Sequence, residues 1–233
     1  MNFEKTLISG ELIKRYKRFF VDVKINRNNI VTAHCPNTGS MMGLLNKGNR
    51  VWLSKSDDPK RKLKYTLQII QEKKAKVGIN THLTNKIVLE ALNKNYINDF
   101  KDFEDVKQEV KFGENTRFDF LITKKNIKTF IEVKNVTLSR KKGVSEFPDA
   151  VTSRGSKHIN ELLNASKMGY DIYLLYVIQR DDCNQFEIAK DIDPKYYNLL
   201  NKAIKSKLNI LCYDCKFLTK GIELNRKIKF KFT

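Results

Sequence analysis

A chain of 233 residues is long enough for one domain with a substantial core or for two smaller units. Its hydrophobic fraction of 41% and charged fraction of 30% are those of a globular protein, and no apolar run approaches the ~20 residues that cross a bilayer, which excludes an integral membrane protein. Basic residues outnumber acidic residues by 45 to 26, and the net charge of +19 indicates a polyanionic partner such as nucleic acid.

The N-terminus and the cysteines both favour the cytoplasm. The first residues mix acids and bases where a signal peptide would need an apolar stretch. The four cysteines are too few and too scattered for a disulfide framework. Cys212 and Cys215 form a lone CxxC, and without a second pair nearby we expect buried thiols rather than a zinc site.

The first third of the chain has the pattern of a small β-barrel. Short segments rich in β-branched and aromatic residues alternate with turn-rich breaks such as "PNTGS" and "NKGN". The predicted strands cover residues 18–25, 29–35, 50–56 and 62–70. Strands at this spacing favour an oligonucleotide-binding (OB) type of barrel, and we expect it to form a nucleic-acid-binding domain over residues 1–78.

The remaining residues, 79–233, predict a second domain of mixed α and β structure. Its elements are a helix over 83–93 with Thr84 or Asn85 as N-cap, strands over 106–112, 116–122 and 127–136, a helix over 152–168 and a buried strand over 171–179. This order is α-β-β-β-α-β. A further helix, capped by Asp193, and two closing strands, "NILCYD" and "RKIKFKF", complete the chain.

Two of these strands bring polar residues together if they form a hairpin that turns at Lys125 and Asn126. In that register Asp119 lies opposite Glu132 and Arg117 lies opposite Lys134. Because side chains alternate between the two faces of a strand, these four residues share one face. The other face is then expected to hold Phe118, Phe120, Ile131 and Val133.

The predicted cluster has two interpretations. Two carboxylates opposite each other lie ~5 Å apart at Cβ and repel, unless a divalent cation offsets the repulsion. A neighbouring lysine could then orient a metal-bound water for attack on a phosphodiester. The alternative is a ladder of salt bridges on a solvated face. Glu90, on the preceding helix, is either a third carboxylate near the cation or an ordinary exposed glutamate.

Basic residues recur in patterns that suit a phosphate backbone. The helix over 152–168 carries Arg154, Lys157 or His158, and Glu161 at helical spacing. The barrel segment "DDPKRKLKY" is basic, with Tyr65 beside it and Trp52 on the preceding strand as possible stacking rings. The predicted nucleic-acid-binding residues are Arg15, Arg18, Lys60, Arg61, Lys62, Lys64, Arg154 and Lys157. The alternatives are a solvated helix face for the helical stripe and a solvated loop for the basic segment of the barrel.

Several segments, in this order, resemble the sugar fermentation stimulation protein (SfsA) family: "VTAHCPNTGSMMGLL", "PKRKLKYTL", "VGINTHL", "IEVKNVTL", "FPDAVTSRGSKHINEL" and "DIDPKYY". The resemblance covers about residues 10 to 225. It implies an OB-like barrel joined to a domain similar to the PD-(D/E)XK nucleases. It also implies catalytic roles for Asp119, Glu132 and Lys134, a metal-binding backbone carbonyl at Val133, and a helix acid at Glu90. Phe118 stands where the motif's name has proline.

The residues and the resemblance together predict a non-specific DNA-binding protein with a nuclease-type site that holds Mg²⁺ or Mn²⁺. The alternative is a non-catalytic DNA-binding regulator that affects sugar (maltose) metabolism genes. Single- and double-stranded DNA are both candidate ligands, and RNA is a third. No membrane partner is expected, and the sequence does not indicate an oligomeric state.

Overall fold

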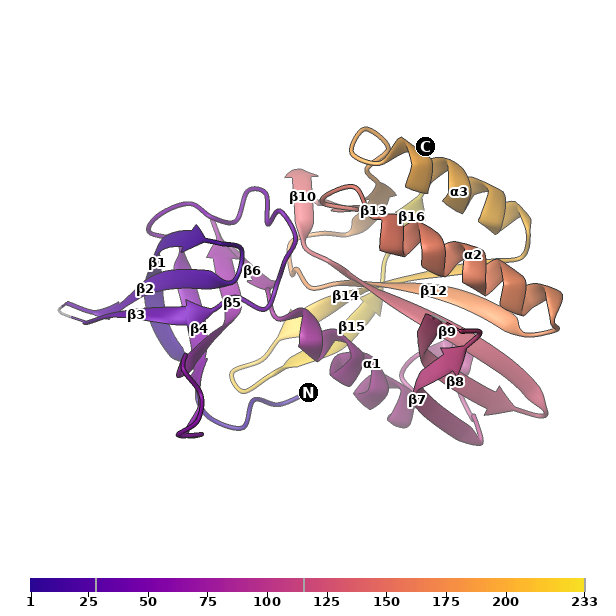
Figure 1. Ribbon diagram of the computed structural model, residues 1–233, viewed down its shortest axis with the longest axis horizontal. Helices are drawn as coiled ribbons and strands as arrows, with labels where there is room; N and C mark the ends of the chain where they lie inside the picture. The colour runs from indigo at the N-terminus through magenta and orange to yellow at the C-terminus, as the bar shows by residue number, and fades with distance from the viewer. Residues whose placement is uncertain (28, 115, 233) are drawn as a thin grey trace.

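The chain folds into two lobes that lie side by side (Figure 1). The computed structural model describes residues 1–27, 29–114 and 116–232. The N-terminal residues build a small barrel, and the later residues build a larger domain in which helices cover both faces of a mixed sheet (Figure 1). The predicted barrel and the predicted α-β-β-β-α-β order are both confirmed.

The described residues of the barrel form one sheet that closes on itself. Its strands are β1 (Ile8–Tyr16), β2 (Phe20–Asn26), β3 (Asn29–His34), β4 (Arg50–Lys55), β5 (Tyr65–Glu72) and β6 (Ala75–Gly78). A parallel pairing between β3 and β5 closes β1, β2, β3, β5 and β4 into the OB-like barrel. Strand β1 was not predicted, because charged residues interrupt its apolar ones and Leu12 is the one residue of the strand that is fully buried.

The larger domain is built on a sheet with the strand order β15-β14-β12-β9-β8-β7. In chain order these strands are β7 (Asp105–Phe112), β8 (Thr116–Lys124), β9 (Ile127–Val136), β12 (Asp171–Ile178), β14 (Asn209–Phe217) and β15 (Ile222–Lys227). A smaller sheet contains β10 (Leu138–Lys141), β11 (Val144–Phe147), β13 (Gln185–Ile188) and β16 (Lys229–Lys231). The predicted last strand is therefore divided between β15 and β16.

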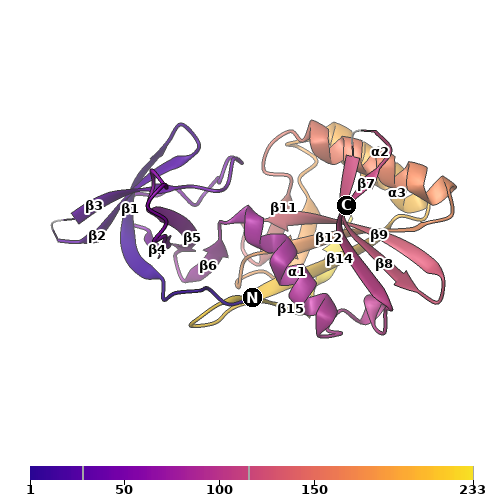
Figure 2. The same cartoon turned by 60° about the horizontal axis from the view of Figure 1, so that its bottom comes forward.

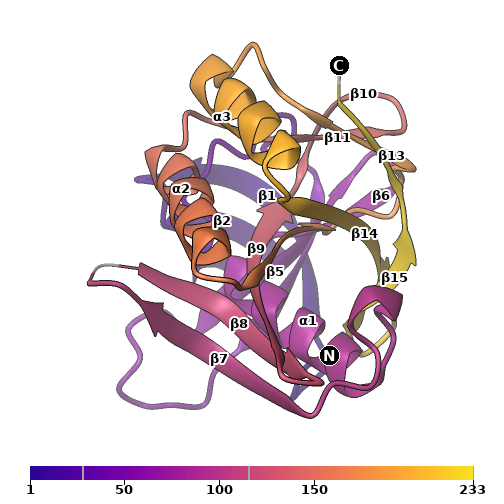
Figure 3. The same cartoon turned by 90° about the vertical axis from the view of Figure 1, so that its right-hand side faces the viewer.

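Three helices pack on the main sheet. They are α1 (Thr84–Asn93), α2 (Ser153–Lys167) and α3 (Pro194–Lys205), and short 3₁₀ turns occur at η1 (Thr81–Leu83) and η2 (Asn98–Phe100). Helices α2 and α3 cover one face and α1 covers the other, so each face has its own apolar core (Figure 3). None of the described helices is both long and apolar enough to span a bilayer.

The helix starts differ in how they are capped. The Asp193 carboxylate accepts a hydrogen bond from the Tyr196 amide, so the predicted cap of α3 is confirmed. The predicted cap of α1 is wrong. The turn η1 runs directly into α1, and the Thr84 hydroxyl donates to the Thr81 carbonyl within that turn. The side chain of Asn85 is consequently available for another contact.

The two cysteines of the CxxC lie on opposite faces of β14. Cys212 belongs to the core under α2 and α3, and Cys215 belongs to the core under α1. Both are buried free thiols, and burial raises the pKa of each well above its ordinary value. The expectation that both are buried thiols is confirmed.

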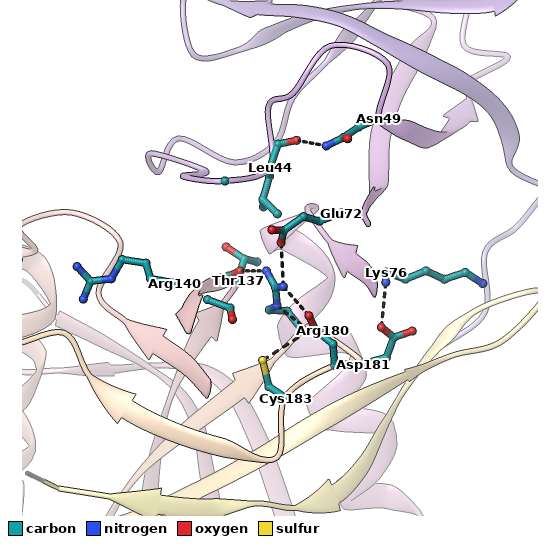
Figure 4. A network of polar contacts seen from close by, with 12 residues as sticks. Leu44, Asn49, Glu72, Lys76, Thr137, Arg140, Arg180, Asp181 and Cys183 are labelled. Atoms are coloured by element: carbon teal, nitrogen blue, oxygen red, sulfur yellow. Dashed lines mark hydrogen bonds and ion pairs between the residues drawn. The ribbon is translucent and has the colours of Figure 1, made fainter. Parts of the chain in front are cut away.

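The barrel is fastened to the larger domain through β6 and the residues after β12. The Gly78 amide donates to the Gln179 carbonyl, and the Lys76 amide donates to the Asp181 carboxylate, each at 2.9 Å. A Cβ atom at Gly78 would lie 2.3 Å from Oε1 of Gln179, so this approach requires glycine. Figure 4 shows the buried Arg180 side chain between Glu72 of the barrel and Thr137 of the larger domain.

Candidate active site

The hairpin of β8 and β9 positions the predicted cluster. Lys125 and Asn126 both have positive φ, 48° and 66°, as a two-residue turn that matches the twist of a hairpin requires. The backbone pairs run from Lys124 opposite Ile127 to Phe120 opposite Ile131. The predicted turn is therefore confirmed, and so is the predicted register over these pairs, but the predicted pairs Asp119–Glu132 and Arg117–Lys134 are not part of the ladder.

The two strands separate just beyond the last backbone pair, and the Asp119 side chain occupies the gap. One Asp119 oxygen accepts from the Val133 amide at 2.7 Å, and the other accepts from the Asn85 side-chain amide at 2.7 Å. Phe118 packs under α2 and α3, whereas Phe120 packs under α1. The prediction that Phe118 and Phe120 share a face is therefore wrong, because the regular alternation of side chains between the two faces of β8 is broken at Asp119.

Glu132 is buried, with 2% of its surface exposed, and so does not lie on a solvated face. Its Oε1 accepts a hydrogen bond from Nζ of Lys134 at 2.5 Å and also contacts Nδ1 of His158. Its Oε2 is buried and has no hydrogen-bond partner in the described structure. Such an orphaned carboxylate oxygen is costly unless a ligand completes it.

The two carboxylates have opposite pKa shifts. Burial, together with the charge of Glu132, raises the pKa of Asp119 to about 6. Burial also acts to raise the pKa of Glu132, but the charges and hydrogen bonds of Lys134 and His158 outweigh it and hold that pKa below its ordinary value. Glu132 is thus the member of the pair that ionises at lower pH, and Asp119 is the member whose pKa is raised to about 6.

This donor set suits a hard divalent cation. Mg²⁺ and related ions take oxygen ligands and often bind through one or two carboxylates plus water and phosphate oxygens. Within residues 1–27, 29–114 and 116–232, no three His, Cys, Asp or Glu side chains converge as a metal cluster. The site therefore offers Asp119 and the orphaned oxygen of Glu132, and leaves the other positions to solvent or to a phosphate.

A cleft of about 640 Å³ is lined by Asp119 and His158. Its other charged lining residues are the basic Lys111, Arg117, Arg154 and Lys157 and the acidic Glu109 and Glu114. Glu132 does not line the cleft itself but contacts His158, which does. The structure thus places the predicted Arg154 and Lys157 at the same cleft as Asp119.

The structure does not bring Glu90 to this cleft. Its carboxylate pairs with the amino group of Met1 and with Nζ of Lys94, and it lies beside Leu224 of β15. Figure 2 shows α1 across the front of the larger domain with the N-terminus beside it. Asn85, in the first turn of the same helix, is the α1 residue whose side chain contacts Asp119.

The predicted basic residues of the barrel are dispersed. Arg15 donates to the carbonyls of Asn37 and Gly39 and so braces that loop, and Arg18 lies in the exposed turn after β1. In the loop before β5, Lys60 and Lys62 are exposed, Arg61 donates to Thr66, and Lys64 donates to the carbonyls of Asp58 and Pro59. The expected stacking rings are only half-buried, and the cations of Arg50 and Lys76 lie over Trp52.

Two contacts at the site were not predicted from the sequence. His158 belongs to the polar helical pattern that is predicted to face a phosphate backbone, yet it is buried against Glu132. Asn85 was considered as a helix cap, yet its amide holds Asp119. Both contacts depend on how α1 and α2 pack against the sheet, and the local sequence does not show this.

A closed OB-like barrel joined to a helix-flanked mixed sheet, with two carboxylates and a lysine at a strand gap, defines a two-domain protein with a restriction-endonuclease-like core. Residues 13–79 match the SfsA N-terminal OB domain, and residues 82–221 match the sugar fermentation stimulation protein RE domain. The chain belongs to the sugar fermentation stimulation protein family. The resemblance inferred from the sequence is confirmed.

Individual relatives match along nearly the whole chain. The sugar fermentation stimulation protein homolog of Pelagibacter ubique is 56% identical over 229 residues, covering 98% of both chains. The homolog of Maricaulis maris is 40% identical and covers 100% of both. The structure of Pyrococcus furiosus SfsA in complex with Ca²⁺ has a TM-score of 0.89 at 23% identity, with 99% of this chain and 98% of that chain covered, and shows the same fold.

Proposed function

We propose that this protein is a metal-dependent nuclease that binds DNA without strong sequence preference. The observation that carries the proposal is the buried Oε2 of Glu132, which has no hydrogen-bond partner in the described structure and belongs to a carboxylate near Asp119, a lining residue of the cleft. The restriction-endonuclease-like fold agrees with this chemistry. Since fold alone does not determine function, the site carries the argument.

Asp119 and Glu132 would hold Mg²⁺ or Mn²⁺, and the backbone carbonyl of Val133 is the proposed third protein ligand. The Pyrococcus furiosus relative was solved with Ca²⁺, another divalent ion that prefers oxygen ligands. When bound, such an ion polarises a phosphate oxygen and makes a water molecule more acidic. Glu90 has no place in this proposal, because its carboxylate is paired elsewhere.

The chain's own residues orient the reacting groups. Asn85 and the Val133 amide fix the Asp119 carboxylate, and His158 fixes the Glu132 carboxylate. The Lys134 ammonium, whose side chain is 12% exposed, lies where it can stabilise negative charge on the attacked phosphate. Around the cleft, Arg154 and Lys157 provide the positive charge that attracts the nucleic-acid backbone.

Cation binding is expected to depend on pH through Asp119. With a pKa of about 6, the carboxylate is about one-tenth ionised near pH 5 and about nine-tenths ionised near pH 7. Since its pKa is raised on folding, this group lowers the stability of the metal-free protein as pH rises from about 4 to about 6. We therefore expect millimolar Ca²⁺ to raise the melting temperature clearly near pH 7 and little near pH 5, as measured by thermal unfolding.

The matched control is Asp119→Asn, which removes the titrating carboxylate and keeps the side-chain size. In this variant the rise in melting temperature on adding Ca²⁺ should be small near both pH 5 and pH 7. An equal rise near pH 5 and pH 7 in the unsubstituted protein would contradict the assignment of Asp119 as a cation ligand.

A cleavage assay tests the proposed activity directly. Purified protein is incubated with labelled single-stranded DNA, double-stranded DNA or RNA, in Mg²⁺, in Mn²⁺ or in EDTA. We expect cleavage of DNA only with metal, and cleavage below detection for Glu132→Gln, which removes the charge from the buried oxygen pair. Glu223→Gln, on β15 beside the cavity that Glu90 lines, is the matched control and should cleave at the unsubstituted rate.

The second candidate function is a non-catalytic DNA-binding regulator of sugar (maltose) metabolism genes. The observation in its favour is that Lys134 already neutralises Glu132 through the 2.5 Å contact, so part of the charge is balanced without a cation. This alternative predicts salt-sensitive DNA binding, because counterion release dominates non-specific affinity. It also predicts no cleavage with either metal.

A further inference from the structure

A second groove lies where the barrel meets the larger domain. It has a volume of about 550 Å³. The barrel contributes His34 at the end of β3 and Arg61 from the loop before β5. The larger domain contributes His82 from η1 and Lys86 from α1. Residues from two domains therefore line one continuous surface.

The charged side chains that line this groove are mostly positive. Arg61 is held in place by a 2.6 Å hydrogen bond from its guanidinium to the Thr66 hydroxyl. Burial and the nearby charges of Arg61 and His82 lower the pKa of His34, which shows that positive groups crowd together here. The charged and titratable groups of the residues that line the groove with His34 are the amino group of Met1, which pairs with Glu90, and the side chains of Glu4, Lys5, Lys55, Arg61, His82 and Lys86. Glu4 is the one carboxylate among these lining residues.

The floor of the groove is polar and internally hydrogen-bonded. The side-chain amide of Gln68 donates from Nε2 to the Ser54 hydroxyl at 2.8 Å. The side-chain amide of Asn80 donates to Oε1 of Gln68 at 2.9 Å. Gln68 and Asn80 are 5% and 8% exposed, so this chain of contacts is fixed by its surroundings. A rigid neutral floor under basic walls favours an anion that also makes polar contacts.

The groove is linked to the proposed active site by consecutive residues of one helix. Asn85 contacts Asp119, which lines the cleft, and Lys86 lines the groove. The first turn of α1 therefore has one residue at Asp119 and the next at the groove. Figure 2 shows α1 beginning beside the barrel and running along the larger domain.

We propose that this groove binds the phosphodiester backbone of a single-stranded segment of the DNA whose other part lies in the active-site cleft; this rests on the proposed function. The volume is that of a small-ligand pocket, so it accepts a few nucleotides of one strand rather than a duplex. His34, Arg61, His82 and Lys86 supply the donors to the phosphates, and the polar floor meets the sugar and base edges.

Binding of a short labelled oligothymidylate, about four nucleotides long, tests the groove without any cleavage when it is measured in EDTA. Arg61→Gln and His34→Gln should each weaken binding about tenfold, the loss expected for one charge-assisted contact. The matched control is Arg27→Gln, which removes an exposed arginine that directly follows β2 and does not line the groove. Equal affinities for Arg61→Gln and Arg27→Gln would overturn the proposal.

The pH dependence gives a second readout, since a phosphodiester keeps its single charge between about pH 5.5 and pH 8. Affinity should increase as pH falls through the histidine range, and His34→Gln should reduce that increase. An identical pH profile for His34→Gln and the unsubstituted protein would contradict the role of His34. Tighter binding of the matching oligouridylate through the same residues would overturn the assignment to DNA.

The outcomes separate this proposal from the proposed nuclease activity. Loss of oligothymidylate binding in Arg61→Gln supports the groove even if no metal produces cleavage, and in that case only the catalytic proposal fails. Metal-dependent cleavage together with unchanged binding in Arg61→Gln and His34→Gln would overturn the groove alone. Thermal unfolding of each variant shows whether the fold is retained.

Discussion

Replacing Lys134 with alanine is expected to lower the rate of metal-dependent DNA cleavage by about 10²- to 10³-fold, the loss that follows removal of one preorganised group that stabilises transition-state charge. Lys134 is nearly buried, and its ammonium lies 2.5 Å from Glu132, in a site where water screens charge poorly. In the proposed mechanism, the change removes positive charge from the place where the attacked phosphate gains negative charge. Initial cleavage rates at saturating Mg²⁺ measure the effect.

Lys128→Ala provides the matched control, because Lys128 lies on the same strand, β9, but is exposed at the hairpin end. We expect this variant to cleave at the unsubstituted rate. If Lys134→Ala cleaved as fast as Lys128→Ala, the activity would come from another site or from a contaminating nuclease. Thermal unfolding of both variants separates a catalytic loss from a folding defect, which Lys134→Ala risks because it leaves Glu132 with His158 as its remaining polar partner.

The position of the candidate site could be predicted from the sequence because a hairpin's register depends on local features. The short polar turn at Lys125 and Asn126 determines which residues face each other, and this register brings Asp119 near Glu132 just beyond the last backbone pair. The reversal of facing at Asp119 was not predictable in the same way. Across from it, Glu109 adopts a positive φ of 51° and the pairing of β7 with β8 is interrupted.

The contributions of the helices could not be predicted from periodicity. A helical period indicates which residues are buried, but not which strand each one reaches. Glu90 lies beside Ile87 and Ala91 as the period requires, yet that edge of α1 faces β15 and the N-terminal residues. His158 lies on the inner side of α2 and meets Glu132, which the sequence places 26 residues earlier.

Arg180→Met is expected to lower the free energy of unfolding by about 3 kcal/mol, at the lower end of the range for breaking a buried ion pair. Arg180 is 2% exposed and is among the largest fully buried side chains. Its guanidinium donates to Glu72 at 2.9 Å, to Asp182 at 2.8 and 2.9 Å and to the Thr137 carbonyl at 2.9 Å (Figure 4). The side chains of Glu72 and Asp182 are 18% and 38% exposed, so solvent recovers part of the loss.

Methionine keeps much of the arginine's length, so the change tests the polar contacts more than the packing. For a chain of this size, about 3 kcal/mol corresponds to a fall in melting temperature of roughly 6–12 °C. Arg27→Met, at an exposed turn position, should change the melting temperature by less than about 2 °C. A melting temperature for Arg180→Met equal to that of Arg27→Met would contradict a stabilising role for the network.

A double-variant cycle with Glu72→Gln then isolates the contact that crosses between the barrel and the larger domain. Because Arg180 and Glu72 bond directly, their effects on stability should be non-additive by about 1 kcal/mol or more. Additive effects would mean that Arg180 acts within the larger domain through Thr137 and Asp182 alone. In that case the barrel would be held mainly by the backbone contacts of β6, whose Gly78 amide bonds the Gln179 carbonyl at 2.9 Å.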